Sequence, residues 1–433
     1  MVERFTLFCY RLLWLPVGLV MPLILFWRSY KGKEDSTRLG ERYGIASLSR
    51  PSSVTSLYWL HGASVGESVS SLVLAMALLK SEPKSHILIT SGTVTSQHML
   101  NRRIDDLGLS DRISCQYHPH DKSGWVERFL DHWRPDALVM MESEIWPNMT
   151  TISHGRGIPV MMASAQISYK SMRRWSGFAR FLARPVFATL SMVITTDKEQ
   201  ADRFESLIPQ DRITIGGSMK AAAPQLPTSQ TMVDKITEGA AGRLIVLLAS
   251  SHDGEEDVFV DAMEAINQSG SFLGIIAPRH LNRTPAIVSI LDENGLTTSL
   301  RSRGQFPEPS TKIWIADAMG EMGSLIEAAD IIVLGGGFAK LGGHNPMEMA
   351  AFGKGVISGP HIFKNKPIFS LLETHQGVLF VDNASKLGDT ITMLSASQTM
   401  RDSLNSGAAA AYNTLTDAAE HTARLIQSKR QSR

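Results

Sequence analysis

Short apolar runs alternate with amphipathic stretches along most of this chain. Runs such as 137–141 and 331–334 are continuously apolar, which is typical of strands buried on both faces of a parallel sheet. The stretch 67–80 instead places its apolar residues at helical spacing. Repeated strand–helix alternation predicts an α/β protein with doubly wound, Rossmann-like sheets.

Two domains are expected, because 433 residues exceed what a single core usually holds. The strand–helix series is interrupted by a proline-rich stretch, 221–232, which we interpret as a linker or surface loop. We predict one domain over residues 31–212 and a second over residues 213–433, with a C-terminal helix closing the second. Ligands bind at the carboxyl ends of such strands, so we expect a cleft between the two facing edges.

The N-terminal segment has a different character. Residues 5–27 are apolar apart from Arg11 and are long enough to span a bilayer, and a basic stretch, 28–42, follows them. We predict a membrane anchor over residues 1–30 that either spans the membrane or lies in its interface. The positive-inside rule then places the bulk of the chain in the cytoplasm, with the basic stretch on anionic headgroups. The alternative is a buried core helix.

Charge and cysteine content narrow the function classes. The net charge is +1, so no broad surface for nucleic acid is expected. The two cysteines, Cys9 and Cys115, are too few for a disulfide framework or a zinc knuckle. The chain has no HExxH or CxxC pattern, and we therefore expect neither a metal ion nor a cofactor.

A glycine-rich stretch, GGGFAKLGGHNPMEMAAFGKGVISGPH, directly follows the apolar run 331–334. Glycines after a strand let the backbone approach a ligand closely. A helix is predicted to open at Asn345 or Pro346, where free backbone N–H groups favour an anion. Glu348 lies one turn inside it, placed to accept hydrogen bonds from sugar hydroxyls. The pattern predicts a site for a phosphorylated, sugar-bearing ligand, and the alternative is a tight turn with no ligand.

Acidic residues follow two predicted strands of the first domain. Glu67 lies at the start of a helix, and Glu142 and Glu144 lie just past another strand. Carboxylates at such an edge are costly unless they are hydrogen-bonded or functional. Glu67 is thus either a catalytic residue or only a first-turn residue favoured by the helix dipole. In the second domain, Lys220 and Arg279 are expected to hold phosphate.

Several motifs occur in a fixed order along the chain: HGASVGE, MESEIWPN, SSHDGEE, APRH, MGEMGSL and GGHNPMEMAAFGKGVISGPH. With these motifs, and with an apolar N-terminal segment followed by GERYG, the chain resembles the Kdo transferases of lipopolysaccharide synthesis. Kdo is 3-deoxy-D-manno-octulosonic acid. The resemblance implies a GT-B fold with an N-terminal acceptor-binding domain and a C-terminal domain that binds the donor, CMP-Kdo. It further implies inverting, metal-independent transfer of Kdo to the lipid A precursor at the inner membrane.

The resemblance also implies roles for individual residues. Glu67 matches the general base of the family, and Glu142 and Lys220 match positions that stabilise the transition state. The remaining matches form the expected CMP site: Pro278, Arg279, Met319, Gly320, Glu321, Asn345, Pro346, Met347 and Glu348.

The chain departs from the family pattern at three places. It has Ser218 and Met219 where the family usually shows Asn-Leu, Gln166 where an arginine is common, and Met349 where proline is usual. These differences leave the exact acceptor and the number of Kdo units open. Two alternatives also remain: a GT-B transferase or epimerase that uses another nucleotide sugar, and a non-catalytic, membrane-tethered sugar-binding protein.

Overall fold

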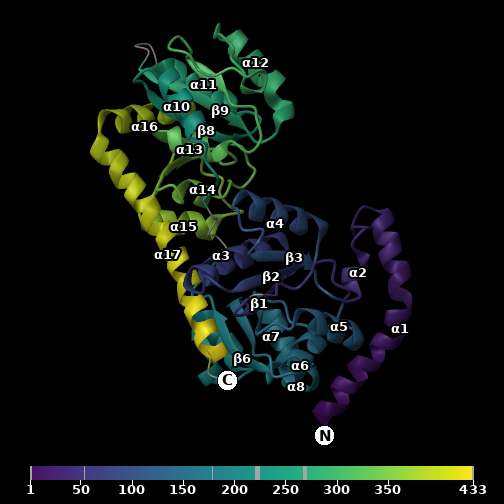
Figure 1. The fold of residues 1–433 in the computed structure, drawn as a ribbon. Helices are drawn as coiled ribbons and strands as arrows, with labels where there is room; N and C mark the ends of the chain where they lie inside the picture. Colours follow the sequence, from purple (N-terminus) through teal and green to yellow (C-terminus); the bar gives the residue numbers. More distant parts are fainter. Residues whose placement is uncertain (1, 53, 178, 220–224, 267–270, 432–433) are drawn as a thin grey trace. The chain divides into compact units, whose positions relative to one another are not determined.

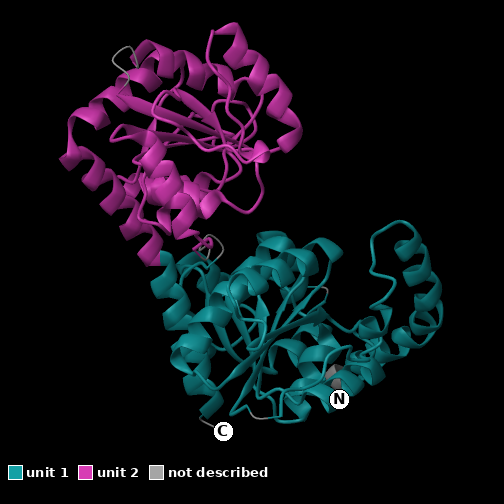
Figure 2. Cartoon of the chain, turned by 45° about the horizontal axis from the view of Figure 1, so that its top comes forward, with its two compact units in different colours: residues 1–222, 415–433 teal, residues 223–414 magenta. Residues whose placement is uncertain are grey.

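The computed structural model describes residues 2–52, 54–177, 179–219, 225–266 and 271–431. They form two compact units, residues 1–222 together with 415–433, and residues 223–414 (Figure 2). Each unit is built on one parallel sheet with helices packed against it (Figure 1). The predicted α/β class with two doubly wound sheets is therefore confirmed.

The first sheet has the strand order β3-β2-β1-β4-β5-β6-β7. Its strands are β1 (Leu57–Gly62), β2 (His86–Ser91), β3 (Ile113–Tyr117), β4 (Ala137–Met141), β5 (Val160–Ala165), β6 (Leu190–Thr195) and β7 (Ile213–Ile215). The helices of this unit are α1 (Val2–Tyr30), α2 (Leu39–Arg42), α3 (Val65–Ser81), α4 (Val94–Asp106), α5 (Ser123–Trp133), α6 (Pro147–Gly155), α7 (Tyr169–Ser176), α8 (Arg180–Phe187) and α9 (Lys198–Glu205). The winding reverses between the adjacent strands β1 and β4, and such a reversal opens a crevice at their carboxyl ends.

The second sheet has the order β10-β9-β8-β11-β12-β13, and its winding reverses between β8 and β11. Its strands are β8 (Leu244–Ser251), β9 (Phe272–Pro278), β10 (Ile313–Ile315), β11 (Ile331–Leu334), β12 (Val356–Ser358) and β13 (Val378–Phe380). The helices of this unit are α10 (Gln230–Ala240), α11 (Glu255–Ile266), α12 (Thr284–Glu293), α13 (Met322–Ala328), α14 (Met347–Ala350), α15 (Lys366–Thr374), α16 (Ala384–Ala396) and the first part of α17 (Gln398–Gln431).

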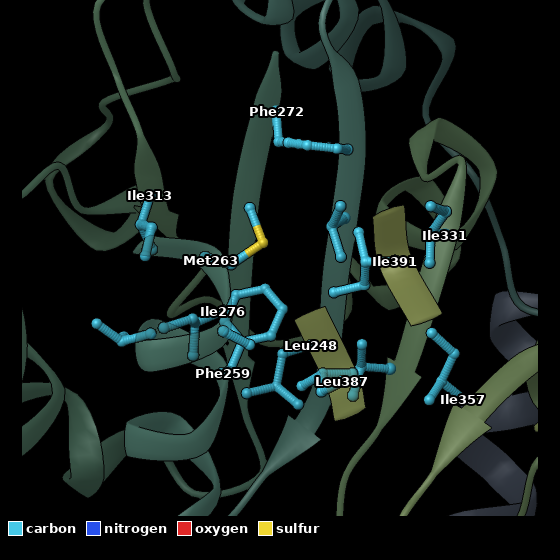
Figure 3. Close-up of a cluster of buried hydrophobic side chains, with 14 of the residues drawn as sticks. Leu248, Phe259, Met263, Phe272, Ile276, Ile313, Ile331, Ile357, Leu387 and Ile391 are labelled. Carbon is cyan, nitrogen blue, oxygen red and sulfur yellow. The ribbon is translucent and has the colours of Figure 1, made fainter. Parts of the chain in front are cut away.

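The core of the second unit lies between its sheet and the helices α11 and α16 (Figure 3). Leu248 and Ile276 come from neighbouring strands, Phe259 and Met263 from successive turns of α11, and Ile391 from α16. Each of these side chains is at most 1% exposed. The apolar pattern of the strands is therefore explained by burial against helices, and it leaves the strand ends as the place for polar chemistry.

The strand β7 differs from the domain boundary that the sequence predicted at residue 212. Val193 of β6 pairs with Ile213, and Thr195 pairs with Ile215, so β7 extends the first sheet instead of beginning the second. The proline-rich stretch that we predicted as a linker is described from residue 225 onward, and it leads into α10.

The long helix α17 belongs to both units. In the second unit, the Asn405 side chain accepts a hydrogen bond from the Gly355 N–H at 2.9 Å. In the first unit, the Lys80 ammonium pairs with Glu420 at 2.6 Å, and Arg430 pairs with Glu82 at 2.7 Å. The C-terminal helix therefore does not simply close the second domain, as the sequence predicted, because its last turns pack on the first.

Among the described residues, α1 contains the helical segment long and apolar enough to cross a membrane, Phe5–Tyr30, with a mean hydropathy of 1.8. Only 11% of that segment is buried. Leu19 and Phe26 are 80% and 72% exposed, whereas Met21 and Leu25 pack in a small cluster with α5. The alternative of a buried core helix is therefore wrong. α1 buries only a narrow side against the first unit, and its remaining surface is exposed although it is apolar.

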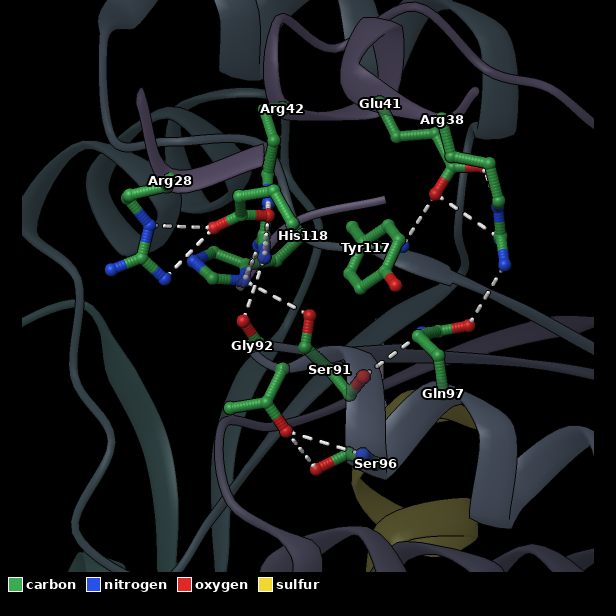
Figure 4. Close-up of polar contacts among 12 residues, drawn as sticks. Arg28, Arg38, Glu41, Arg42, Ser91, Gly92, Ser96, Gln97, Tyr117 and His118 are labelled. Atoms are coloured by element: carbon green, nitrogen blue, oxygen red, sulfur yellow. Dashed lines mark hydrogen bonds and ion pairs between the residues drawn. The ribbon is translucent and has the colours of Figure 1, made fainter. Parts of the chain in front are cut away.

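One arginine of the basic stretch 28–42, Arg42, is buried and paired inside the first unit (Figure 4). Arg42 is 1% exposed and pairs with Glu34 at 2.9 Å. It also donates a hydrogen bond to the backbone oxygen of Gly92 at 2.6 Å. Arg28 pairs with the same carboxylate at 2.9 Å. The headgroup contact that we predicted for this stretch is thus wrong at Arg42, because a buried, paired arginine cannot reach a lipid surface.

Candidate active site

Glu67 and Glu142 lie at the carboxyl ends of the adjacent strands β1 and β4, where the first sheet reverses its winding. Glu67 is in the first turn of α3, and Glu142 directly follows β4. Gly62 lets α3 begin this close to the strand, because a Cβ on Gly62 would lie 2.8 Å from the Glu67 Cβ. The fold therefore brings two carboxylates that are far apart in the sequence to the same edge of the first sheet.

The carboxylate of Glu67 closes a capping box at the start of α3. Its Oε2 accepts hydrogen bonds from the backbone N–H groups of Ala63 at 2.6 Å and Ser64 at 3.2 Å. In return, the Ser64 hydroxyl accepts a hydrogen bond from the Glu67 N–H at 3.3 Å. The capping box gives this first-turn glutamate a structural role at the helix N-terminus. It does not exclude chemistry, because both hydrogen bonds end on the same carboxylate oxygen.

The backbone at Glu142 is in the left-handed region, with φ of 53°, although the residue is not glycine. Such a conformation costs free energy, and it is held here by hydrogen bonds from the Glu142 N–H to Ala163 and from the Gln166 N–H to Glu142. The strained turn carries Glu144 along the same edge. The pKa of Glu144 is raised, first by its burial and second by the negative charge of Glu67.

Lys220 lies outside the described residues. The residue before it is fixed, because the Met219 N–H donates a hydrogen bond to the hydroxyl of Ser164 at 3.1 Å. Met219 is fully buried. The departure from leucine at this position is therefore a change between two apolar core residues of similar volume.

Sequence reasoning missed the aromatic and histidine residues that support this edge. The indole N–H of Trp146 donates a hydrogen bond to the Nε2 of His61 at 3.2 Å, and the Nδ1 of His61 contacts the Thr90 hydroxyl at 3.0 Å. Burial lowers the pKa of His61 to about 4, so its ring is neutral near pH 7. The signal lay in the WLHG and EIWPN motifs, but only the fold shows that they meet.

The residues of the expected CMP site gather at the carboxyl edge of the second sheet. They follow three strands of that sheet: Pro278 ends β9 and Arg279 follows it, Met319–Glu321 come after β10, and Asn345–Glu348 come after β11. The Asn345 side chain accepts a hydrogen bond from the Met347 N–H at 3.0 Å. The helix predicted to open here is α14, which is only four residues long.

Glu255, which sequence reasoning did not single out, braces the glycine-rich loop after β11. It is 1% exposed, and its carboxylate accepts four backbone hydrogen bonds. The donors are the N–H groups of His252 at 3.0 Å, Gly336 at 2.8 Å, Phe338 at 3.0 Å and Ala339 at 3.1 Å. Because Glu255 begins α11 directly after β8, it ties together the two strands between which the winding reverses.

Two of the glycines have a structural explanation. A Cβ on Gly335 would lie 2.3 Å from the backbone oxygen of Ser250, and a Cβ on Gly337 would lie 2.6 Å from the Ser358 hydroxyl. These glycines therefore make room for the neighbouring strand ends. The alternative of a tight turn explains them without a ligand, so the binding prediction depends on the polar residues around the loop.

Two histidines stack across the reversal point of the second sheet. The rings of His252 and His344 lie 4.9 Å apart at an angle of 13°, with their Nε2 atoms 2.7 Å apart. One Nε2 must donate and the other accept, so at least one of the two rings is neutral. Burial, followed by the charge of the other ring and then of Arg279, lowers the pKa of His344 to about 4. The His344 ring is therefore neutral near pH 7.

The fold first defines the class of the protein. The chain is similar to the UDP-GlcNAc 2-epimerase from Neisseria meningitidis bound to UDP-GlcNAc, with a TM-score of 0.52 and 12% identity. The similarity covers 87% of this chain and 100% of the epimerase chain. At this identity the likeness shows the fold alone, which is the GT-B type of two Rossmann-like units.

The sequence comparisons then define the family. Residues 37–223 match the family model of 3-deoxy-D-manno-octulosonic-acid transferase (kdotransferase). The transferase of that name from Rickettsia felis is 31% identical over 343 residues, which cover 78% of this chain and 71% of the relative. The one from Haemophilus influenzae is 30% identical over 376 residues, which cover 84% of this chain and 85% of that relative. The chain belongs to the Kdo transferase family, and it is accordingly a glycosyltransferase whose transferred group is Kdo.

Proposed function

We propose that this protein is an inverting, metal-independent transferase that moves Kdo from CMP-Kdo to the lipid A precursor, lipid IVA, in the synthesis of the lipopolysaccharide inner core. The observation that carries the proposal is the position of Glu67, at the winding reversal of the first sheet of a Kdo transferase. A carboxylate at such a crevice is suited to take the proton of an acceptor hydroxyl.

Glu67 is the proposed general base. Because its Oε2 is fixed by Ala63 and Ser64, the carboxyl group is held in one orientation, and its other oxygen can face the acceptor. A single displacement assisted by one base leads to inversion at the reacting carbon. Glu142 and Lys220 are proposed to stabilise charge in the transition state.

The second unit is proposed to hold CMP-Kdo. The phosphate would lie near Arg279 and the glycine-rich loop, with the backbone of Met319–Glu321 and the stretch Asn345–Glu348 around the rest of the nucleotide. The carboxylate of Glu321 is itself paired with Arg301 at 2.8 Å, which leaves backbone groups of its loop for the ligand. The departing CMP then has its charge neutralised by basic side chains, so no metal ion is required.

The proposed location is the cytoplasmic face of the bacterial inner membrane. The exposed apolar side of α1 would lie in the membrane interface, while its other side stays on the first unit. Tyr10 and Arg11 of α1 support this placement, because they donate hydrogen bonds to Asp121 at 2.8 Å and to Asn148 at 3.1 Å. A lipid acceptor is then delivered beside the enzyme.

Mass spectrometry of the lipid formed from CMP-Kdo and lipid IVA tests the proposal. The expected product is heavier by whole Kdo units, and turnover should persist in EDTA. Competition by CMP but not by UDP would separate this function from another nucleotide-sugar transferase or an epimerase. Absence of any Kdo-bearing lipid would refute the proposed acceptor.

A further inference from the structure

The first unit contains a pocket of about 410 Å³ at the carboxyl ends of β4 and β5. Most of its lining residues come from the loops after these strands and from the helix α7. Its volume lies within the range of pockets that bind small molecules, about 300–1,000 Å³. None of the residues so far matched to the donor lines it.

The walls of the pocket combine aromatic faces with polar groups. Trp146 and Trp175 line it, together with the polar residues Gln166, Ser168 and Ser171. Each tryptophan is held in place, Trp146 by its hydrogen bond of 3.2 Å to a buried histidine and Trp175 by edge-on packing against a phenylalanine at 5.9 Å. Rigid aromatic surfaces beside hydrogen-bonding groups are suited to a sugar ring, which has apolar faces and a polar rim.

One cationic side chain, Arg174, is among the residues that line the pocket. It projects from α7, where the neighbouring Arg173 instead stacks on Tyr169 with 5.9 Å between the guanidinium and the ring centroid. An arginine at the edge of a sugar-sized pocket favours a ligand that carries an anionic group.

The pocket is continuous with the carboxylate edge of the candidate active site. Glu144 lines it, and this residue follows β4 two positions after Glu142, at the sheet edge that also carries Glu67. The Gln166 N–H bonds to the backbone oxygen of Glu142 at 3.2 Å. A ligand in the pocket would therefore lie beside the proposed base.

The pocket also borders helices that pack in series against the apolar N-terminal helix. α7 packs on α8, and α8 packs on α1, the apolar N-terminal helix. The Thr6 hydroxyl donates a hydrogen bond to the Phe181 backbone oxygen at 2.8 Å. Tyr169 of α7 and Phe181 of α8 are 61% and 40% exposed. A ligand held in a lipid layer would reach this pocket along these helices, whereas a free nucleotide would gain nothing from them.

We propose that this pocket binds a sugar ring of the acceptor glycolipid, stacked between Trp146 and Trp175, with Arg174 facing an anionic group on the acceptor. This assignment rests on the proposed function, because the subsite is for the lipid acceptor of the proposed Kdo transfer. It makes Gln166 part of the acceptor subsite, at a position where the family commonly has an arginine.

The test measures binding and turnover with a deacylated, water-soluble form of the acceptor. Arg174→Ala should raise the KM and the dissociation constant for this acceptor about tenfold or more, as expected for a lost charged hydrogen bond. The KM for CMP-Kdo should stay unchanged. Ser171→Trp, which fills the pocket, should have the same effect, while Arg173→Ala and Ser176→Trp on the same helix serve as matched controls.

The outcomes separate the pocket from the proposed function. If Kdo is transferred but the Arg174 and Ser171 variants behave like their controls, the pocket assignment is overturned and the function stands. If the deacylated acceptor binds in a manner that depends on Arg174 but no Kdo is transferred, the pocket stands and the function falls. A loss of thermal stability in the Arg174 variant alone would show a structural role instead.

Discussion

The carboxylate oxygen Oε2 of Glu67 accepts a hydrogen bond from the backbone N–H of Ala63 at 2.6 Å. One glutamate thus both caps α3 and lies at the crevice where acceptor chemistry is proposed. The two roles have different chemical requirements. Capping needs only an oxygen acceptor, whereas general-base catalysis needs a carboxylate that can take up a proton.

Glu67→Gln should therefore separate the two roles. The amide oxygen can still close the capping box, so the melting temperature should change little. Turnover should fall by about a hundredfold or more, because an amide cannot act as the base. Ser64→Ala is the reverse control, which should cost about 1 kcal/mol of stability with a much smaller loss of turnover. Near-normal turnover in Glu67→Gln would exclude the base assignment.

Glu255→Gln should destabilise the second unit. A glutamine presents one acceptor oxygen in place of two, so two of the four backbone donors lose their partner. These are either Phe338 and Ala339, which share Oε1, or His252 and Gly336, which share Oε2. Each such loss costs about 1–3 kcal/mol, and urea unfolding should show a decrease of at least about 2 kcal/mol. Asp253→Asn is the matched control, since the Asp253 side chain is 87% exposed and its ion pair is worth less than about 1 kcal/mol. Equal stability of the two variants would contradict the bracing role.

Arg279→Ala should weaken CMP binding by about 1.5–3 kcal/mol, the value typical of a hydrogen bond to a charged group. Arg279 follows β9 at the edge where the histidine pair lies, and its charge lowers the pKa of His344. Calorimetry with CMP measures the effect. Arg303→Ala, at an exposed arginine of the same unit, is the control, and unchanged CMP affinity in Arg279→Ala would remove this residue from the site.

The exposed side of α1 should govern activity on membranes. The double variant Leu19→Glu and Phe26→Glu should leave turnover on a deacylated acceptor intact, since neither side chain is buried. Turnover on lipid in vesicles should fall about tenfold or more, because burying each apolar side chain in lipid contributes about 1.5–3 kcal/mol. The double variant Met393→Glu and Met400→Glu controls for the added charge, because both methionines are exposed in the second unit.

Deletion of residues 1–27 is a harsher version of this experiment. Both sheets lie after residue 50, so the truncated protein should fold. It should also be less stable, because Asp121 loses the hydroxyl of Tyr10 and α5 loses its contact with Leu25. If the truncated protein works equally well on vesicles, α1 has no part in capturing the acceptor.

Stability should decline in mild acid. The pKa of His61 is lowered to about 4 in the folded protein by burial, whereas an unfolded histidine titrates near 6.5. Between these values the unfolded chain binds a proton that the folded chain does not, so this contribution is complete above pH 6.5 and is lost as the pH falls towards 4. Urea midpoints across this range should show the decline. His61→Gln should make it less steep without abolishing it, because the pKa of other buried histidines, such as His344, is also lowered to about 4. His98→Gln, at an exposed histidine, should leave the slope unchanged.

The order of elements, the α/β class and the position of Glu67 at the start of a helix were available from the sequence. The reason is local: buried parallel strands are continuously apolar, and a glutamate in the first turn of a helix is visible from its neighbours. The motifs around Glu67 and Asn345 also carried the family resemblance, and relatives at 30–31% identity agree with it.

What only the tertiary structure decided are contacts between segments that are distant along the chain. Glu255 acquires its four backbone donors because β8 and β11 are adjacent, although 81 residues separate it from Gly336. The sequence predicted that Arg42 contacts lipid headgroups, but in the fold it is buried in an ion pair with Glu34. The strand β7 joins the first sheet, and α17 returns to the first unit, because each completes packing there that no local pattern encodes. The spacing of apolar residues shows which side of a helix or strand will be buried. Which other element covers that side depends on the packing of the whole chain.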